Sequence, residues 1–109
     1  MFDEKLTFEQ KEQIVRYLMK CYRKSSNRAQ RYEILECVRE NYEIYRNDRT
    51  TCMLVDEAVA ELSKDEQLVI RNDYMHPIEE KWYLEYWSRS TYQRLKGIAV
   101  DKFLRCLHA

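Results

Sequence analysis

The side chains best suited to a chemical role lie close together between positions 89 and 96. This stretch combines basic, hydroxyl and amide side chains, namely Arg89, Ser90, Thr91, Gln93, Arg94 and Lys96. Hydroxyl groups and the N–H groups of a helix N-terminus bind phosphates, and Arg and Gln form hydrogen bonds to base edges in the major groove of DNA. We therefore expect duplex DNA as the partner, with Arg89 and Lys96 mainly on phosphates and Gln93 or Arg94 on bases.

The elements around this stretch have the spacing of a helix-turn-helix. A short helix from Ile78 to about Trp87 would be followed by a three-residue break and a longer helix that Ser90 caps. Lys96 and Arg94 would lie off the buried stripe of the longer helix and project outward. The same spacing also fits an ordinary antiparallel helix pair with a capped, solvated end.

Groups for catalysis are few and have simpler explanations. His76 precedes Pro77 and is explained as a residue that ends a helix, and His108 is the only other histidine. Acidic pairs such as Glu79–Glu80 fall in first turns of helices, where carboxylates are stabilising. The sequence has no glycine-rich phosphate loop, so we expect neither an enzyme nor a small-molecule substrate.

The four cysteines are Cys21, Cys37, Cys52 and Cys106. No pair has the close spacing of a zinc knuckle or of a redox motif. Each lies beside apolar residues in a helical pattern, so we interpret them as free thiols of the core. No metal and no cofactor are expected.

Length and composition predict one all-α domain over residues 1–109. Of these 109 residues, 45% are hydrophobic and 35% are charged, with a single Gly and a single Pro. Few helix breakers and many charges favour amphipathic helices over sheets. There is no signal peptide and no apolar run of about 18 residues, so we expect a cytoplasmic protein without a membrane partner.

Charge is balanced overall but unevenly distributed. Residues 1–88 hold 14 Lys and Arg against 18 Asp and Glu, whereas residues 89–109 hold five basic residues and Asp101 alone. An acidic body with a basic last helix is a common layout among nucleic-acid binders. Basic residues near a helix C-terminus also suit the helix dipole, so this layout has a structural explanation as well.

Hydrophobic periodicity and capping residues divide the chain into five or six helices in a compact bundle. Capping boxes are predicted at Thr7, Ser63 and Ser90. Polar stretches at 24–27 and 46–49 are expected to interrupt the helices, which would span about 8–23, 27–45, 51–62, 64–74, 78–87 and 90–107. Residues 1–61 would form the N-terminal helices and residues 62–107 the helix-turn-helix-like portion.

The run from Trp87 to Ala99, WSRSTYQRLKGIA, resembles the signature Ser-x-Ser-Thr-Tyr-Tyr-Arg-x-Lys-x-x-Ala of ArpU-type phage transcriptional regulators. LSKDEQLVI, from Leu62 to Ile70, is similar to the preceding helix in that family and in the C-terminal domain of sigma factors. The resemblance implies transcription regulation through DNA binding by Ser90, Thr91, Gln93, Arg94 and Lys96. Gln93 replaces the family's second Tyr. In length and composition the chain also resembles an uncharacterised mycoplasmal family of dimeric five-helix proteins, which implies no function.

A cluster of aromatic residues surrounds the predicted break, namely Trp82, Tyr83, Tyr86, Trp87 and Tyr92. Most of them are expected to pack in the core, and the rest to form a partner surface, most simply that of a homodimer. Stacking on the bases of a single-stranded nucleic acid is the alternative for the exposed members. Two functions remain open. The first is a dimeric DNA-binding regulator, and the second is an all-helical interaction or homodimeric assembly module that does not bind DNA.

Overall fold

The computed structural model describes residues 5–108, without the side chain of His108. In chain order the elements are α1 (Phe8–Ile34), η1 (Arg39–Asn41), α2 (Tyr42–Ala60), α3 (Lys64–Ile70), η2 (Arg71–Met75), η3 (Trp82–Glu85) and α4 (Arg89–His108). No strand occurs within residues 5–108, so the all-α prediction is confirmed. None of the helices described there has both the length and the apolar character needed to span a membrane.

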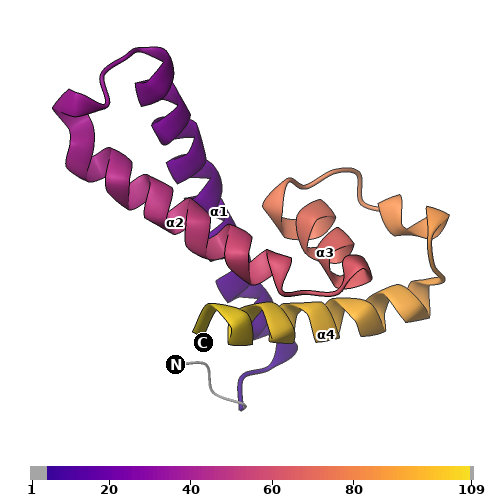
Figure 1. The fold of residues 1–109 in the computed structure, drawn as a ribbon. Coiled ribbons are helices and arrows are strands. Elements are labelled where there is room, and N and C mark those ends of the chain that lie inside the picture. The colour runs from indigo at the N-terminus through magenta and orange to yellow at the C-terminus, as the bar shows by residue number, and fades with distance from the viewer. Residues whose placement is uncertain (1–4, 109) are drawn as a thin grey trace.

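The helices form a body and a projecting hairpin (Figure 1). Helices α1 and α2 run antiparallel, and their connected ends extend away from α3, η2, η3 and α4, which makes the molecule elongated, with extents of 50 × 32 × 21 Å. Helix α4 runs along the base of the body and contacts α1, α2 and α3. The beginning of α4 extends toward η3, beyond the hairpin.

Two helix starts agree with their predicted capping boxes. The Thr7 hydroxyl accepts the N–H of Gln10 at 3.1 Å, and the Gln10 side chain accepts the N–H of Thr7 at 2.9 Å. Ser63 and Glu66 form the same reciprocal pair at the start of α3, at 3.3 and 2.8 Å. Each box satisfies two N–H groups that a helix start leaves without intrahelical partners.

The expected interruptions at 24–27 and 46–49 are wrong, because both stretches lie inside helices. Ser25 is buried, and Arg28 of α1 binds Asp48 of α2 with two contacts of 2.7 Å. Asp48 is 2% exposed. The polar residues are therefore paired with one another across the hairpin, and this pairing was not visible in the pattern of either segment alone.

The turn between α1 and α2 lies at Leu35–Val38, a stretch without Gly, Pro or Asn to mark a turn. Glu36 has a φ of 54°, in the left-handed region, and its N–H donates to the carbonyl of Glu33. The N–H of Cys37 donates to the carbonyl of Tyr32 at 3.0 Å. These two bonds form a Schellman motif, which usually has Gly at the left-handed position. Because Glu stands there, the end of α1 was missed.

The core lies where α1, α2, α3 and α4 meet. Its fully buried side chains come from every one of these segments and from η2, and include Val15, Met19, Val59, Val69, Ile70, Tyr74, Val100, Phe103 and Leu104. Arg23 of α1 donates to the carbonyls of Tyr74 and Met75 at 2.6 and 3.2 Å, which satisfies the end of η2. The helix ends before His76 and Pro77, as predicted.

The predicted helix from Ile78 to Trp87 is wrong. Only the short 3₁₀ turn η3 forms there, and residues 76–81 are irregular. Trp82 and Tyr83 are adjacent in sequence and both buried, whereas Ile78 and Tyr86 are more than half exposed. A single α-helix presents one face to the core, so the aromatic side chains of this segment pack better on a tight turn. The predicted helix-turn-helix spacing is therefore not formed in residues 78–90.

The last helix begins one residue before the predicted cap. The hydroxyl of Ser88 accepts the N–H of Thr91 at 3.3 Å, so Ser88 and not Ser90 caps α4. The helix then continues to His108, close to its predicted end.

Replacing Asp48 with Asn tests the ion pair that joins the two hairpin helices. We expect Asp48→Asn to lower the free energy of unfolding by about 1–3 kcal/mol, because it removes a charge-assisted pair of hydrogen bonds to Arg28. Chemical denaturation measures the change. Asn47→Ala, one residue away on the exposed side of α2, is the control and should change it little.

The same variant has a pH signature. Arg28 holds the pKa of Asp48 below its usual value of 3.8, mainly through its hydrogen bond, and this outweighs the opposing effect of burial. The resulting stability is present above the unfolded-state pKa and is lost as the pH falls through the lower folded-state value. Stability should thus fall less steeply with acid in Asp48→Asn than in the wild type. Equal slopes would contradict this role.

Candidate functional site

A polar cleft lies beside the beginning of α4. It has a volume of about 440 Å³ and is lined by residues of α1, η2, η3, α4 and the irregular segment before η3, namely Arg16, Asn72, Asp73, Pro77, Ile78, Glu80, Lys81, Tyr83, Arg89, Tyr92, Gln93 and Lys96. The lining holds four basic side chains against two carboxylates. Three of the six residues that the sequence singled out, Arg89, Gln93 and Lys96, lie along it.

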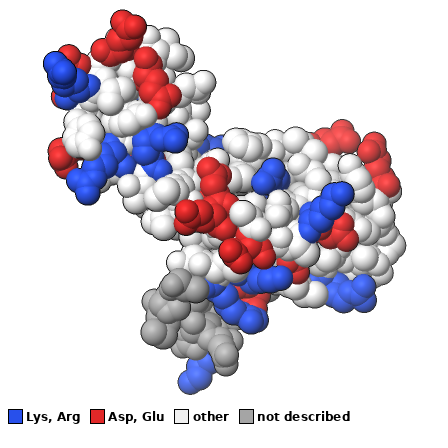
Figure 2. Space-filling model, in the orientation of Figure 1, with Lys and Arg blue, Asp and Glu red and all other residues white. Residues whose placement is uncertain are grey.

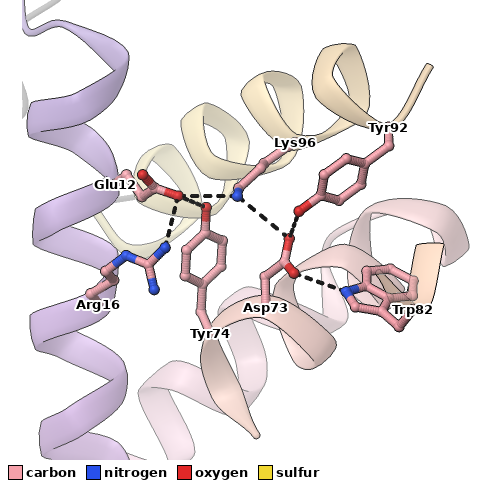
Figure 3. A network of polar contacts seen from close by, with 7 residues as sticks. All are labelled: Glu12, Arg16, Asp73, Tyr74, Trp82, Tyr92 and Lys96. Carbon is pink, nitrogen blue, oxygen red and sulfur yellow. Dashed lines mark hydrogen bonds and ion pairs between the residues drawn. The ribbon is translucent and has the colours of Figure 1, made fainter. Parts of the chain in front are cut away.

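Lys96 joins three elements at the floor of this cleft (Figure 3). Its ammonium lies 3.2 Å from a carboxylate oxygen of Glu12 in α1 and 3.8 Å from one of Asp73 in η2. It also lies 5.6 and 5.4 Å from the ring centres of Tyr74 and Tyr92, within the range of cation–π attraction. Its side chain is 15% exposed. Lys96 thus positions α4 against the body.

Each of the two carboxylates has further donors (Figure 3). Glu12 accepts the hydroxyl of Tyr74 at 2.7 Å and a guanidinium N–H of Arg16 at 3.2 Å. Asp73 accepts the indole N–H of Trp82 at 2.9 Å and the hydroxyl of Tyr92 at 2.6 Å. Every charge in the network therefore has more than one partner, as partly buried charges require.

The network shifts the pKa values of Glu12, Tyr74 and Tyr92. Burial alone would raise the pKa of Glu12, but the hydrogen bond from Tyr74 and the charges of Lys96 and Arg16 outweigh it and lower the pKa. Burial and the hydrogen bonds to carboxylates raise the pKa values of Tyr74 and Tyr92 well above 10. Both phenols thus remain donors, and Glu12 remains a charged acceptor, over the whole neutral range.

The aromatic cluster packs the start of α4 onto η3. The rings of Tyr83 and Tyr92 stack at 3.8 Å with an interplanar angle of 2°, and Trp82 meets both edge-on. These three side chains are buried, and Trp87 is half-buried. Tyr86 is 56% exposed. The prediction that most of the cluster packs in the core is confirmed.

The residues predicted to contact DNA fall on different sides of α4. Arg89, Gln93 and Lys96 follow the cleft, whereas Ser90 and Arg94 share an outer row with Gly97. Arg89, Ser90, Gln93 and Arg94 are exposed. Thr91 is half-buried, and its hydroxyl accepts that of Ser88 at 3.0 Å.

The expectation that Lys96 projects outward is wrong. Its place on the helix lies between the buried Tyr92 and Val100, and its ammonium is bound by the carboxylates of α1 and η2. Sequence reasoning missed both carboxylates, Glu12 and Asp73, because they lie in segments far from α4 along the chain. A lysine amid the apolar residues of a helical stripe is the one sequence signal that could have indicated a buried ion pair.

The two arginines at the start of α4 differ from the other basic residues of this helix, whose side chains are paired. Lys11, Lys96, Lys102 and Arg105 each have an ion-pair partner. Arg89, Arg94 and the neighbouring Lys81 have none within residues 5–108, and all three are exposed. Glu80 lies in the same cleft as Arg89. Figure 2 shows acidic and basic side chains interspersed over the body on the face drawn. This face therefore carries no extended positive patch.

Other reactive groups do not converge on a second centre. Cys52 is buried, and Cys21, Cys37 and Cys106 are half-buried free thiols. His76 is exposed and meets the ring of Tyr22 edge-on at 6.2 Å. The side chain of His108 lies outside the described residues. Within the part of the chain that the structure describes, no group of three or more His, Cys, Asp or Glu side chains could hold a metal ion.

In comparisons with known proteins, the chain matches no family model, no curated protein and no solved structure.

The contrast between Lys96 and Arg94 yields a stability prediction. Lys96→Ala should lower the free energy of unfolding by about 1–3 kcal/mol, because Glu12 and Asp73 lose their common cation. Arg94→Ala should change it by less than about 0.5 kcal/mol, because this side chain is exposed and has no ion pair within the described residues. Thermal or chemical denaturation of both variants measures the difference. Equal effects of the two variants would show that Lys96 does not position α4.

Proposed function

We propose that this protein is a transcriptional regulator that binds duplex DNA through the beginning of α4. The observation that carries the proposal is the contrast between the two sides of this helix. Tyr92 and Lys96 hold its inner side on the body, while Arg89 and Arg94 remain exposed, with no ion pair within residues 5–108. A rigid helix start with free guanidinium groups has the chemistry that contacts phosphates and guanine edges.

The outer row is the part that would enter the major groove. Ser90, Arg94 and Gly97 lie on successive turns and carry no acidic side chain among them. Arg94 would then bind a base edge, with Gln93 beside it. Ser90 and Thr91 would contact the DNA backbone through hydroxyl groups, the usual role of such side chains.

Gly97, the only glycine of the chain, supports this orientation. It lies inside α4, where glycine is less favourable than alanine by about 0.5–1 kcal/mol. A Cβ atom at this position would meet no atom of the protein within 4 Å, so the fold does not require glycine there. A bare helix surface allows a partner to approach the backbone closely.

The cleft side would receive a phosphate group of the DNA backbone. Arg89 and Lys81 both line the cleft and are exposed, and neither has an ion-pair partner in the described part of the chain. Arg16, which also lines the cleft, remains bound to Glu12. In this arrangement Lys96 does not touch DNA but positions the residues that do, which revises its expected role.

The second candidate function is an assembly module that does not bind DNA. Glu80 lines the same cleft as Arg89 and weakens its positive potential. Acidic and basic groups also alternate over the drawn face of the body. These two features favour a protein partner, and direct measurement of DNA binding separates the two functions.

Arginine variants on the two rows should affect DNA binding differently. Arg89→Ala should weaken binding to all duplexes alike and flatten the dependence of log K on log salt by about one unit. Arg94→Ala should instead reduce discrimination at one base position, by about 1–3 kcal/mol. Selection from random duplexes followed by fluorescence anisotropy measures both effects.

Arg105→Ala is the matched control for these variants. Arg105 lies near the other end of α4 and is paired with Asp101, so its removal should leave DNA affinity unchanged. Equal losses in all three variants would indicate nonspecific charge attraction. Absence of binding at low salt in the wild type would exclude the DNA-binding function and leave the assembly module.

Gly97→Leu provides a steric test of the outer row. Leucine is a better helix former than glycine, so the variant should fold at least as stably as the wild type. If α4 enters the groove, the added side chain should weaken DNA binding at least about tenfold through steric clash with the duplex. An unchanged affinity in the folded variant would show that this row does not face DNA.

A further inference from the structure

The outward face of α2 carries apolar side chains that no other element of the described chain covers. Met53 is 53% exposed and Tyr42 is 56% exposed. They border a shallow groove of about 460 Å³ along the helix, lined by Tyr42, Tyr45, Arg46, Arg49, Thr50, Cys52, Met53, Asp56 and Glu57. This surface lies on the projecting hairpin, away from α4's exposed beginning (Figure 1).

Charge along this groove is ordered by position. Arg46 and Arg49 lie toward the N-terminal end of α2, and Asp56 and Glu57 lie toward its C-terminal end. Neither Arg46, Arg49 nor Glu57 has an ion pair among residues 5–108, and Asp56 has only a hydrogen bond of 3.0 Å from the hydroxyl of Tyr22. The hairpin therefore exposes a positive half and a negative half on either side of Met53.

The charges of this face are complementary to those of a second α2 helix that runs in the opposite direction. Two copies related by a twofold axis between positions 51 and 52 place position 46 opposite 57 and position 50 opposite 53. Arg46 of each copy then faces Glu57 of the other, about 8 Å along the helix from the axis. Thr50 faces Met53 at the centre, where the long side chain of Met53 covers the groove of the partner.

We propose that a second copy of this chain occupies the groove, with the two α2 helices antiparallel across a twofold axis. A parallel arrangement is disfavoured, because it places arginines opposite arginines and carboxylates opposite carboxylates. A polyanion such as DNA is disfavoured because Asp56 and Glu57 fill one half of the groove. The dimer does not depend on DNA binding, and the two proposals can fail separately.

The stiffness of the hairpin supports a helix-to-helix contact. Arg28 and Asp48 join α1 and α2 near this surface, and Tyr45 donates a hydrogen bond to Glu33 across the hairpin. The side chains of Thr50 and Thr51 are bonded to carbonyls of their own helix at 3.0 Å. The face is therefore preorganised, and binding of a partner helix would cost it little conformational entropy.

A charge swap tests the arrangement. Sedimentation velocity over a wide concentration range should show the wild type passing from a 13.5 kDa monomer to a species of twice that mass. Glu57→Arg and Arg46→Glu should each raise the dimer dissociation constant at least about tenfold, since each creates two like-charge contacts. Combining the two changes in one chain should restore dimerisation to within about threefold of the wild type.

Lys64→Glu is the control, because Lys64 is exposed at the start of α3, outside the groove, and should leave the dimer unchanged. Circular dichroism checks that every variant keeps its helices, and Met53→Asp provides a second, apolar probe that should also weaken the dimer. A wild type that stays monomeric at millimolar concentration would overturn the proposal. A dimer that is insensitive to both single reversals would overturn it as well, because its interface would lie elsewhere.

Discussion

The bridge that Lys96 makes between Glu12 and Asp73 determines how the last helix sits on the rest of the molecule. It joins the beginning of the chain, the turn after α3 and the middle of α4 through one ammonium group. Each carboxylate also accepts a hydrogen bond from a tyrosine hydroxyl, so its hydrogen-bonding capacity is satisfied although it is largely buried. This anchor places the helix backbone from which the exposed Arg89 and Arg94 project.

Charged side chains have two roles in this molecule. Several of the paired ones join helices to one another, and unpaired ones lie on surfaces that a partner can reach. Arg28 and Asp48 hold the hairpin together, and Lys102 with Glu66 ties α4 to α3. Cations without an ion pair within the described residues lie on several surfaces, and two groups of them border grooves, one at the beginning of α4 and one along the outer face of α2. We assign a partner to each of these two surfaces. The beginning of α4 would bind duplex DNA, and the outer face of α2 would bind a second copy of the chain.

Local signals predicted the helical class, two capping boxes and the last helix, because each depends on residues that are close in sequence. What failed depended on contacts between distant segments. Residues 24–27 and 46–49 resemble breaks until Arg28 is seen to face Asp48, and Lys96 resembles a surface lysine until α1 and η2 are placed against it. The turn at Glu36 was missed because its left-handed residue is not glycine.

The candidate site was therefore predicted only in part. Its position at the start of α4 came from residue types in one short run, and four of its six side chains are exposed there. The helix expected before it was wrong because Trp82 and Tyr83 are both buried from adjacent positions, which a 3₁₀ turn permits. The cleft itself could not be predicted, since Arg16, Asp73 and Lys81 come from three separate segments.

The most direct test of DNA binding by α4 is a titration of the ¹⁵N-labelled protein with duplex DNA at low ionic strength, observed through its backbone amide signals. If α4 binds DNA, the largest shift changes should fall on residues 88–98 and on the adjoining cleft residues, and the outer face of α2 should change little. Shift changes that are absent, or that are confined to α2, would contradict the assignment of the α4 surface to DNA.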